Sequence, residues 1–143
     1  MKRLTQGVVA VLALGLVACT SLPGGEDSLY QRLGGEAGIE GIVYELLVEI
    51  ANDERIVERF RELNIARFQQ GLETYLCSVT GGPCQYTGDS MRIVHSGHNF
   101  TDSEFNALVE NLITAMNRRD VDTGTQNRLL AILARDYKDV VYL

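Results

Sequence analysis

The chain has 143 residues, of which 45% are hydrophobic and 22% charged, and its formal net charge is −6. The negative charge disfavours nucleic acid as a partner and gives no electrostatic attraction to an anionic lipid surface. The length suits one domain around one hydrophobic core, so we expect no second domain.

Residues 1–18 have the form of a bacterial secretory signal. Lys2 and Arg3 precede an apolar run over 8–18 that is too short to span a membrane. The run ends in LVAC, which resembles the lipobox of bacterial lipoproteins. The alternative is a plain cleaved signal followed by an unrelated cysteine. We predict a signal peptide over 1–18 and lipidation at Cys19.

Residues 19–28, CTSLPGGEDS, are predicted to form a lipidated, flexible tether because they are rich in Gly, Pro and Ser. Thr20 follows the cysteine, which by resemblance to bacterial lipoproteins favours the outer membrane. Loss of the signal leaves 11 basic and 19 acidic residues, a net charge of −8, so the lipid and not the surface must provide membrane attachment. We expect an exported protein that is lipid-anchored, in the outer membrane, facing the periplasm.

From residue 29 onward apolar residues recur at helical spacing, and no run alternates as a strand does, so we predict an all-α fold. One apolar stripe covers 42–50 and stops at Asn52–Asp53, and a second covers 65–79 and stops at Gly81–Gly82. A short helix is expected over 91–95. Thr101 and Glu104 form a capping box that opens a helix to about 116, and the last helix is expected over 126–137.

Cys77 and Cys84 flank the segment SVTGGP, whose glycines and proline allow the chain to bend back. In an exported protein both cysteines reach an oxidising compartment. We predict a disulfide between them, with two free thiols as the alternative.

The only two histidines, His95 and His98, lie in MRIVHSGHNF, about 60° apart around a helix. They could share zinc, but a structural zinc site needs four ligands, and no Cys-x-x-Cys or carboxylate cluster accompanies them. Ser90 and Ser96 lack a Gly-rich nucleophile turn, which argues against hydrolysis. Haem needs one proximal histidine beside an apolar, aromatic slot, and Phe100 helps to supply such an edge. A surface histidine remains the simple alternative.

From residue 29 to about 140 the chain resembles the group I truncated haemoglobins, the two-over-two globins. The matching segments occur in the family's order and are LYQRLGG, GIEGIVYELLVEIANDERIVERF, TGGPCQYTG and MRIVHSGHNFTDSEF. The resemblance implies a truncated globin domain over 29–143, folded as a two-over-two helical sandwich. It also implies haem b (iron protoporphyrin IX) as cofactor and a diatomic gas as ligand.

The resemblance assigns roles around the haem. His95 matches the proximal ligand, the residue that binds the metal, and His98 matches a position near a haem propionate. Phe60 matches the aromatic residue that packs on the haem, and Tyr86 lies in the turn that leads into the proximal helix. Phe100 completes the apolar edge beside the proximal residue.

The expected distal side departs from the family. Leu47 and Leu72 stand where many members place a tyrosine and a glutamine that donate hydrogen bonds to the bound gas, and Phe68 stands at the gating position. We therefore expect an apolar pocket. Tyr44, or the glutamine pair at 69–70, reaches into it only if the register differs from this alignment.

Three functional hypotheses follow. The first is a globin that reversibly binds O2, CO or NO at iron held by His95. The second is a haem-dependent oxidoreductase or NO-detoxifying protein, which needs an external reductant such as an electron-donor protein. The third is a haem-binding module without a gas function. The apolar distal pocket argues against functions that depend on a firmly held dioxygen, such as oxygen storage or NO dioxygenation.

Overall fold

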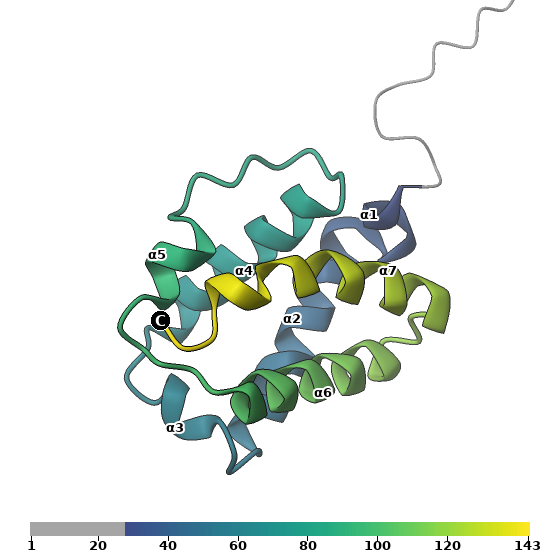
Figure 1. Ribbon diagram of the computed structural model, residues 1–143. Helices are drawn as coiled ribbons and strands as arrows, with labels where there is room; N and C mark the ends of the chain where they lie inside the picture. Colours follow the sequence, from purple (N-terminus) through teal and green to yellow (C-terminus); the bar gives the residue numbers. More distant parts are fainter. Residues whose placement is uncertain (1–27) are drawn as a thin grey trace, which may run out of the picture.

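The structure is a computed structural model that describes residues 28–143 (Figure 1). The predicted signal, most of the tether and Cys19 lie outside the described residues. The elements are α1 (Leu29–Arg32), α2 (Gly35–Ala51), α3 (Val57–Phe60), α4 (Ile65–Val79), α5 (Met91–His95), α6 (Asp102–Arg118), α7 (Thr123–Leu133) and the 3-10 helix η1 (Ala134–Asp139).

The all-α prediction is confirmed, because the described residues contain helices and one isolated bridge, between Phe100 and Val141, but no strand. Within this part of the chain, no helix combines the length and the apolar character that a membrane crossing requires.

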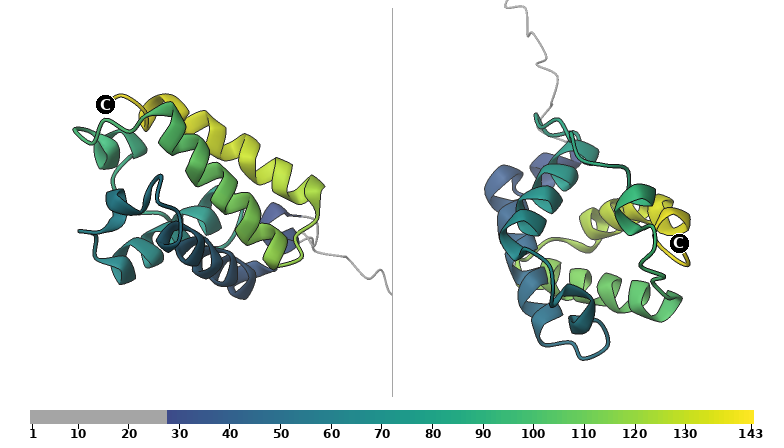
Figure 2. Two further views of the ribbon diagram at one scale, coloured as in Figure 1. Left: turned by 90° about the horizontal axis from the view of Figure 1, so that it is seen from below. Right: turned by 90° about the vertical axis from the view of Figure 1, so that its left-hand side faces the viewer.

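The helices form two layers, with α2 and α4 in one and α6 and α7 in the other (Figure 2). α2 packs against both α4 and α6, so it lies at the centre of the fold. Its inward stripe is almost fully buried and consists of Ile39, Ile42, Val43, Leu46 and Ile50. The facing layer contributes small and flexible side chains, namely Ala107, Ala115, Met116 and Leu129. The two-over-two sandwich predicted from the sequence is therefore observed.

The start of α2 depends on close backbone contact with α1. Gly34, the residue before α2, has a left-handed φ of 92°, which glycine adopts without strain. A Cβ atom at Gly38 would lie only 1.9 Å from the carbonyl oxygen of Leu33. The two glycines therefore allow the short first helix to turn directly into α2.

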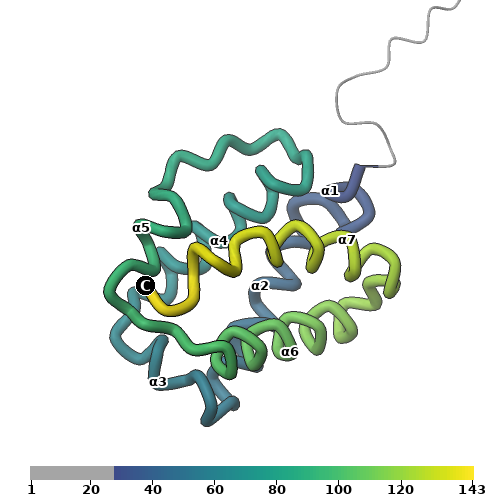
Figure 3. The backbone as a smooth tube through the Cα atoms, viewed as in Figure 1, coloured from purple at the N-terminus to yellow at the C-terminus, as the bar shows by residue number. Residues whose placement is uncertain are grey.

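A long irregular segment over 80–90 connects α4 to α5 and crosses one side of the molecule (Figure 3). The Cys77–Cys84 disulfide, with a Cα–Cα distance of 5.7 Å, ties its first half to the end of α4. The backbone N–H of Tyr30 donates to the Thr80 carbonyl at 3.0 Å and joins the same region to α1. The predicted disulfide is thus present.

Most helix boundaries agree with the sequence patterns. α4 and α5 occupy the predicted ranges, and the capping box of Thr101 and Glu104 opens α6. The last helix begins earlier than predicted, at Thr123, because Asp122 caps it through the Thr125 N–H, and it tightens to 3-10 geometry at Ala134. The one-turn helix α3 was not predicted, since four residues carry too short a pattern.

Candidate functional site: a slot between α4 and α5

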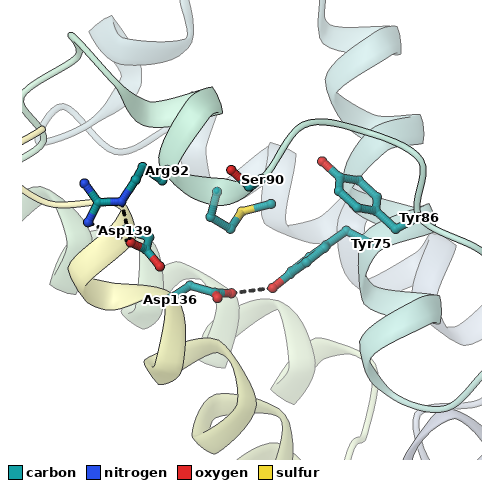
Figure 4. A pocket seen from close by; sticks show the side chains of 7 residues that line it. Tyr75, Tyr86, Ser90, Arg92, Asp136 and Asp139 are labelled. Atoms are coloured by element: carbon teal, nitrogen blue, oxygen red, sulfur yellow. Dashed lines mark hydrogen bonds and ion pairs between the residues drawn. The ribbon is translucent and has the colours of Figure 1, made fainter.

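Two helix faces line the candidate site. Phe68, Leu72 and Tyr75 share one face of α4, and all three are only partly buried. Met91 and His95 lie one turn apart on α5 and are also partly buried. Tyr75 and Met91 border a common cavity of about 420 Å³ (Figure 4). We call the space between α4 and α5 the slot, and the cavity beside Tyr75 and Met91 lies at one end of it.

His95 is oriented by its own helix. Ser90 caps α5 by accepting the Ile93 N–H, and one turn later the Nδ1 atom of His95 lies 2.7 Å from the Met91 carbonyl oxygen. A carbonyl only accepts, so Nδ1 must carry the proton and the neutral ring keeps its lone pair on Nε2. This arrangement is the one in which an imidazole binds a metal through Nε2.

The segment after His95 is attached to α3 and α6 through Arg59. The Arg59 guanidinium lies 5.1 Å from the centre of the Phe100 ring, and that ring meets the His95 ring edge-on at 5.7 Å. Arg59 also donates to the His98 carbonyl at 3.0 Å and to Glu104 at 2.5 Å. The hydrogen bond from Arg59 is the main cause that lowers the Glu104 pKa to about 2.

The side of the slot opposite α5 is apolar. Phe60 and Phe68 pack edge-to-face at 5.4 Å. Behind them, a second cavity of about 360 Å³ lies between α2, α3 and the start of α4, and its lining includes Leu47, Phe60 and Ile65. Leu72 packs on the edge of the core. Leu47 and Leu72, which align with the distal hydrogen-bond donors of many truncated haemoglobins, therefore offer only hydrocarbon to this region.

The end of the slot next to η1, which we call its inner end, is by contrast polar. The Tyr75 hydroxyl donates a hydrogen bond to the Asp136 carboxylate of η1. Burial raises the pKa of Tyr75, and the hydrogen bond to Asp136 raises it further. Tyr86 packs edge-to-face on Tyr75 at 5.3 Å, and its own hydroxyl donates to the Asp89 carbonyl at 3.0 Å.

Comparison with known families decides the identity of the fold. The model of the bacterial-like globin family matches residues 28–141. The chain belongs to the bacterial-like globin family.

Individual relatives agree with this globin assignment. The group 1 truncated haemoglobin GlbN of a Nostoc species is 34% identical over 95 residues, which are 66% of this chain and 80% of the relative. The truncated haemoglobin of Tetrahymena pyriformis, in its Fe(III) form, has a TM-score of 0.79 and 25% identity, covering 82% of this chain and 100% of that one. The 2/2 haemoglobin of Synechococcus, with covalently attached haem, has a TM-score of 0.75 and 27% identity over 80% and 98% of the chains. The predicted truncated globin is confirmed.

The register of this globin leaves the alternative distal donors outside the slot. Tyr44 is 60% exposed on α2. The Gln69 amide donates to Glu73 on its own helix at 2.8 Å, and Gln70 is exposed. The His98 ring is exposed and lies 6.0 Å from the Phe100 ring, at the rim of the slot.

The structure gathers the sequence-predicted residues into three groups. His95, His98 and Phe100 lie around α5, Phe60 packs on Phe68 and shares a cavity with Leu47, and Tyr86 packs on Tyr75 at the inner end. Sequence reasoning did not assign Arg59 or Asp136 a role. Tyr75 lies seven residues after Phe68 in the predicted α4 stripe, but no local pattern connects it with Asp136, 61 residues away.

The two histidines have no companions for a zinc site in the part of the chain that is described. Residues 28–143 contain no group of three or more His, Cys, Asp or Glu side chains that could hold a metal ion.

Proposed function

We propose that this globin binds haem in the slot between α4 and α5, and that the iron is held by Nε2 of His95 and binds a diatomic gas reversibly. The observation that carries the proposal is the hydrogen bond from His95 Nδ1 to the Met91 carbonyl, because it leaves Nε2 as the metal-binding nitrogen. A histidine on a solvated surface needs no such fixed tautomer.

The residues present fit a flat, largely apolar cofactor with polar groups on one edge. Phe68 and Leu72 offer an apolar surface on α4, and Met91 offers a polarisable one on α5. His98, whose exposed ring lies 6.0 Å from the Phe100 ring, would donate to a propionate of the cofactor. When bound, haem would supply an iron atom that takes a gas ligand and one-electron redox chemistry.

We assign the cofactor to haem b. Attachment of the c type uses a Cys-x-x-Cys-His sequence. Here Ile93 and Val94 precede His95, and the two described cysteines are joined to each other. In this proposal the macrocycle would be held by His95 at the iron and by packing, without c-type thioether bonds.

The apolar distal side favours CO or NO over O2. Each missing hydrogen bond to a polar gas ligand removes about 1–2 kcal/mol of selective stabilisation. Leu47 and Leu72 cannot donate, and Tyr44 is exposed. We therefore expect O2 to be held more weakly, relative to CO, than in truncated haemoglobins that carry distal donors.

Spectra of the full chain with ferric haem, after reduction and after CO addition, test the proposal. His95→Ala should lose most bound haem or its histidine-ligated spectrum. The matched variant His98→Ala should keep that spectrum and bind haem slightly less tightly, because an exposed contact is worth at most about 1 kcal/mol. A normal haem spectrum in His95→Ala would show that another residue binds iron.

We further propose that the protein is exported and lipid-anchored through Cys19, in the outer membrane and facing the periplasm. The Cys77–Cys84 disulfide supports export, since such bonds persist in oxidising compartments. Cys19→Ser should abolish labelling by a radioactive or clickable fatty acid and recovery in the membrane fraction. Unchanged labelling would contradict lipidation at this residue.

A further inference from the structure

The 3-10 helix η1 contacts both walls of the slot. Asp136 accepts the hydrogen bond of Tyr75 on α4, and Asp139 lies 3.0 Å from the Arg92 guanidinium on α5. The close view shows both contacts side by side, with Tyr75 and Arg92 approaching η1 from different helices (Figure 4). No direct helix-to-helix packing is needed to set the separation of α4 and α5 at this end, because η1 bridges them.

The α4 side of this bridge is held in place by the disulfide. Tyr75 stands two residues before Cys77, and Tyr86 stands two residues after Cys84. Closing the disulfide therefore brings both tyrosines to the same side of the loop, where their rings pack at 5.3 Å. Tyr75 is thereby confined, and its hydroxyl is directed to Asp136.

The α5 side of the bridge acts on the helix that carries His95. Arg92 follows Met91, whose carbonyl orients the His95 ring. The Arg92–Asp139 pair is well exposed on the arginine side and contributes little energy by itself. The Tyr75–Asp136 bond is partly buried and joins a hydroxyl to a carboxylate, so it is the stronger of the two contacts.

We propose that Tyr75 and Asp136 are positioning residues that close the inner end of the slot and control how slowly bound haem is lost. This inference rests on the proposed haem binding. It assigns a role in cofactor retention to two residues that do not touch iron, and Tyr86 and the disulfide serve it by confining the Tyr75 ring.

The test measures haem loss from the full chain. Ferric haem-loaded protein is mixed with a large excess of apomyoglobin, and transfer is followed by absorbance. Tyr75→Phe, which removes only the hydroxyl, should lose haem about tenfold faster, the factor that corresponds to 1.4 kcal/mol. Asp136→Leu should behave alike, and Asp136→Asn, which keeps an acceptor oxygen, should restore most of the retention.

Two comparisons separate positioning from general stability. Tyr137, the next residue of η1, donates its hydroxyl to Asp102 on α6, and neither residue lines the cavity at the inner end. Tyr137→Phe therefore removes the same kind of bond and should change haem loss by less than about twofold. The double variant Tyr75→Phe/Asp136→Leu should lose haem no faster than either single variant, because both remove one interaction.

The outcomes are distinct. Equal haem loss from wild type and Tyr75→Phe, or equal acceleration by Tyr75→Phe and Tyr137→Phe, would overturn the positioning role while haem binding stands. A wild-type chain that takes up no haem would overturn both this inference and the proposed function. Urea unfolding of each haem-free variant checks the fold, and faster haem loss that merely followed a loss of haem-free stability would also overturn the role.

Discussion

Replacing Arg59 by methionine should loosen the connection between α3, α6 and the segment that follows His95. The guanidinium binds both carboxylate oxygens of Glu104, at 2.5 and 3.0 Å, and the His98 carbonyl at 3.0 Å. Methionine preserves part of the packing on Phe100 but offers no donor. The charge-assisted pair with Glu104 is therefore the interaction that the substitution removes.

The size of the effect follows from the Glu104 pKa. Its fall from 4.5 to about 2 corresponds to about 3 kcal/mol of preference for the charged form. Because the Arg59 side chain is 35% exposed, solvent screening reduces the expected loss to about 1–2 kcal/mol at pH 7. The folded pKa is the lower one, so this stabilisation is complete above pH 4.5 and disappears as pH falls towards 2.

Urea unfolding at pH 7 and at pH 3 measures this difference. Arg59→Met should cost about 1–2 kcal/mol at pH 7 and less than half of that at pH 3. Arg61→Met is the matched control, because Arg61 pairs with Glu58 on an exposed surface and should cost less than about 0.5 kcal/mol. An equal loss at both pH values would refute the assignment of the effect to the Glu104 charge.

Three further predictions concern the scaffold. The folded full chain should show no reactive thiol from Cys77 or Cys84 before reduction, and two thiols in the untreated protein would contradict the pairing. Replacing both cysteines by serine should lower the free energy of unfolding in urea by roughly 2 kcal/mol. Gly38→Ala should lower the free energy of unfolding by about 1–3 kcal/mol, because the new methyl group would collide with the Leu33 carbonyl. Gly71→Ala, which has open space around it, should instead stabilise α4 by about 0.5–1 kcal/mol. Thermal unfolding that ranks the two variants in the opposite order would be inconsistent with the backbone contact at Gly38. Thr101→Ala should cost about 1 kcal/mol in urea unfolding by removing the α6 cap, and no change would show the cap to be dispensable.

Helix positions were predictable wherever a long apolar stripe ended at a clear stop. The α4 stripe stops at Thr80, before Gly81, whose left-handed φ of 85° suits glycine at the end of a helix. The last helix was placed too late because its first turn, Thr123 to Thr125, is polar and its start depends on the Asp122 side chain. Periodicity detects a buried face, whereas a cap is detected only when its residues form a recognised pair, as in α6.

The site was only partly predictable, for a physical reason. Resemblance and local spacing identified His95, because a short helix brings the Met91 carbonyl to Nδ1 within a single turn. Arg59 and Asp136 act across 39 and 61 residues of sequence. Each is a charged residue in a polar segment, where no hydrophobic periodicity identifies it. Such contacts follow from the packing of the layers and become visible only in three dimensions.

These distant contacts explain how a helix as short as α5 keeps its place. Five residues cannot form a stable helix alone, and Ile93 and Val94 face solvent and add no core packing. The segment that follows is held instead by other elements. The N–H groups of Gly97 and Asn99 donate to the Leu143 carbonyl at 3.1 and 2.9 Å.

Arg59 holds the same segment from α3, and Asp139 holds Arg92 from η1. The position of His95 is therefore imposed by tertiary contacts on both sides of α5. Substitutions at these contacts should alter the proximal side of the site without touching the histidine itself.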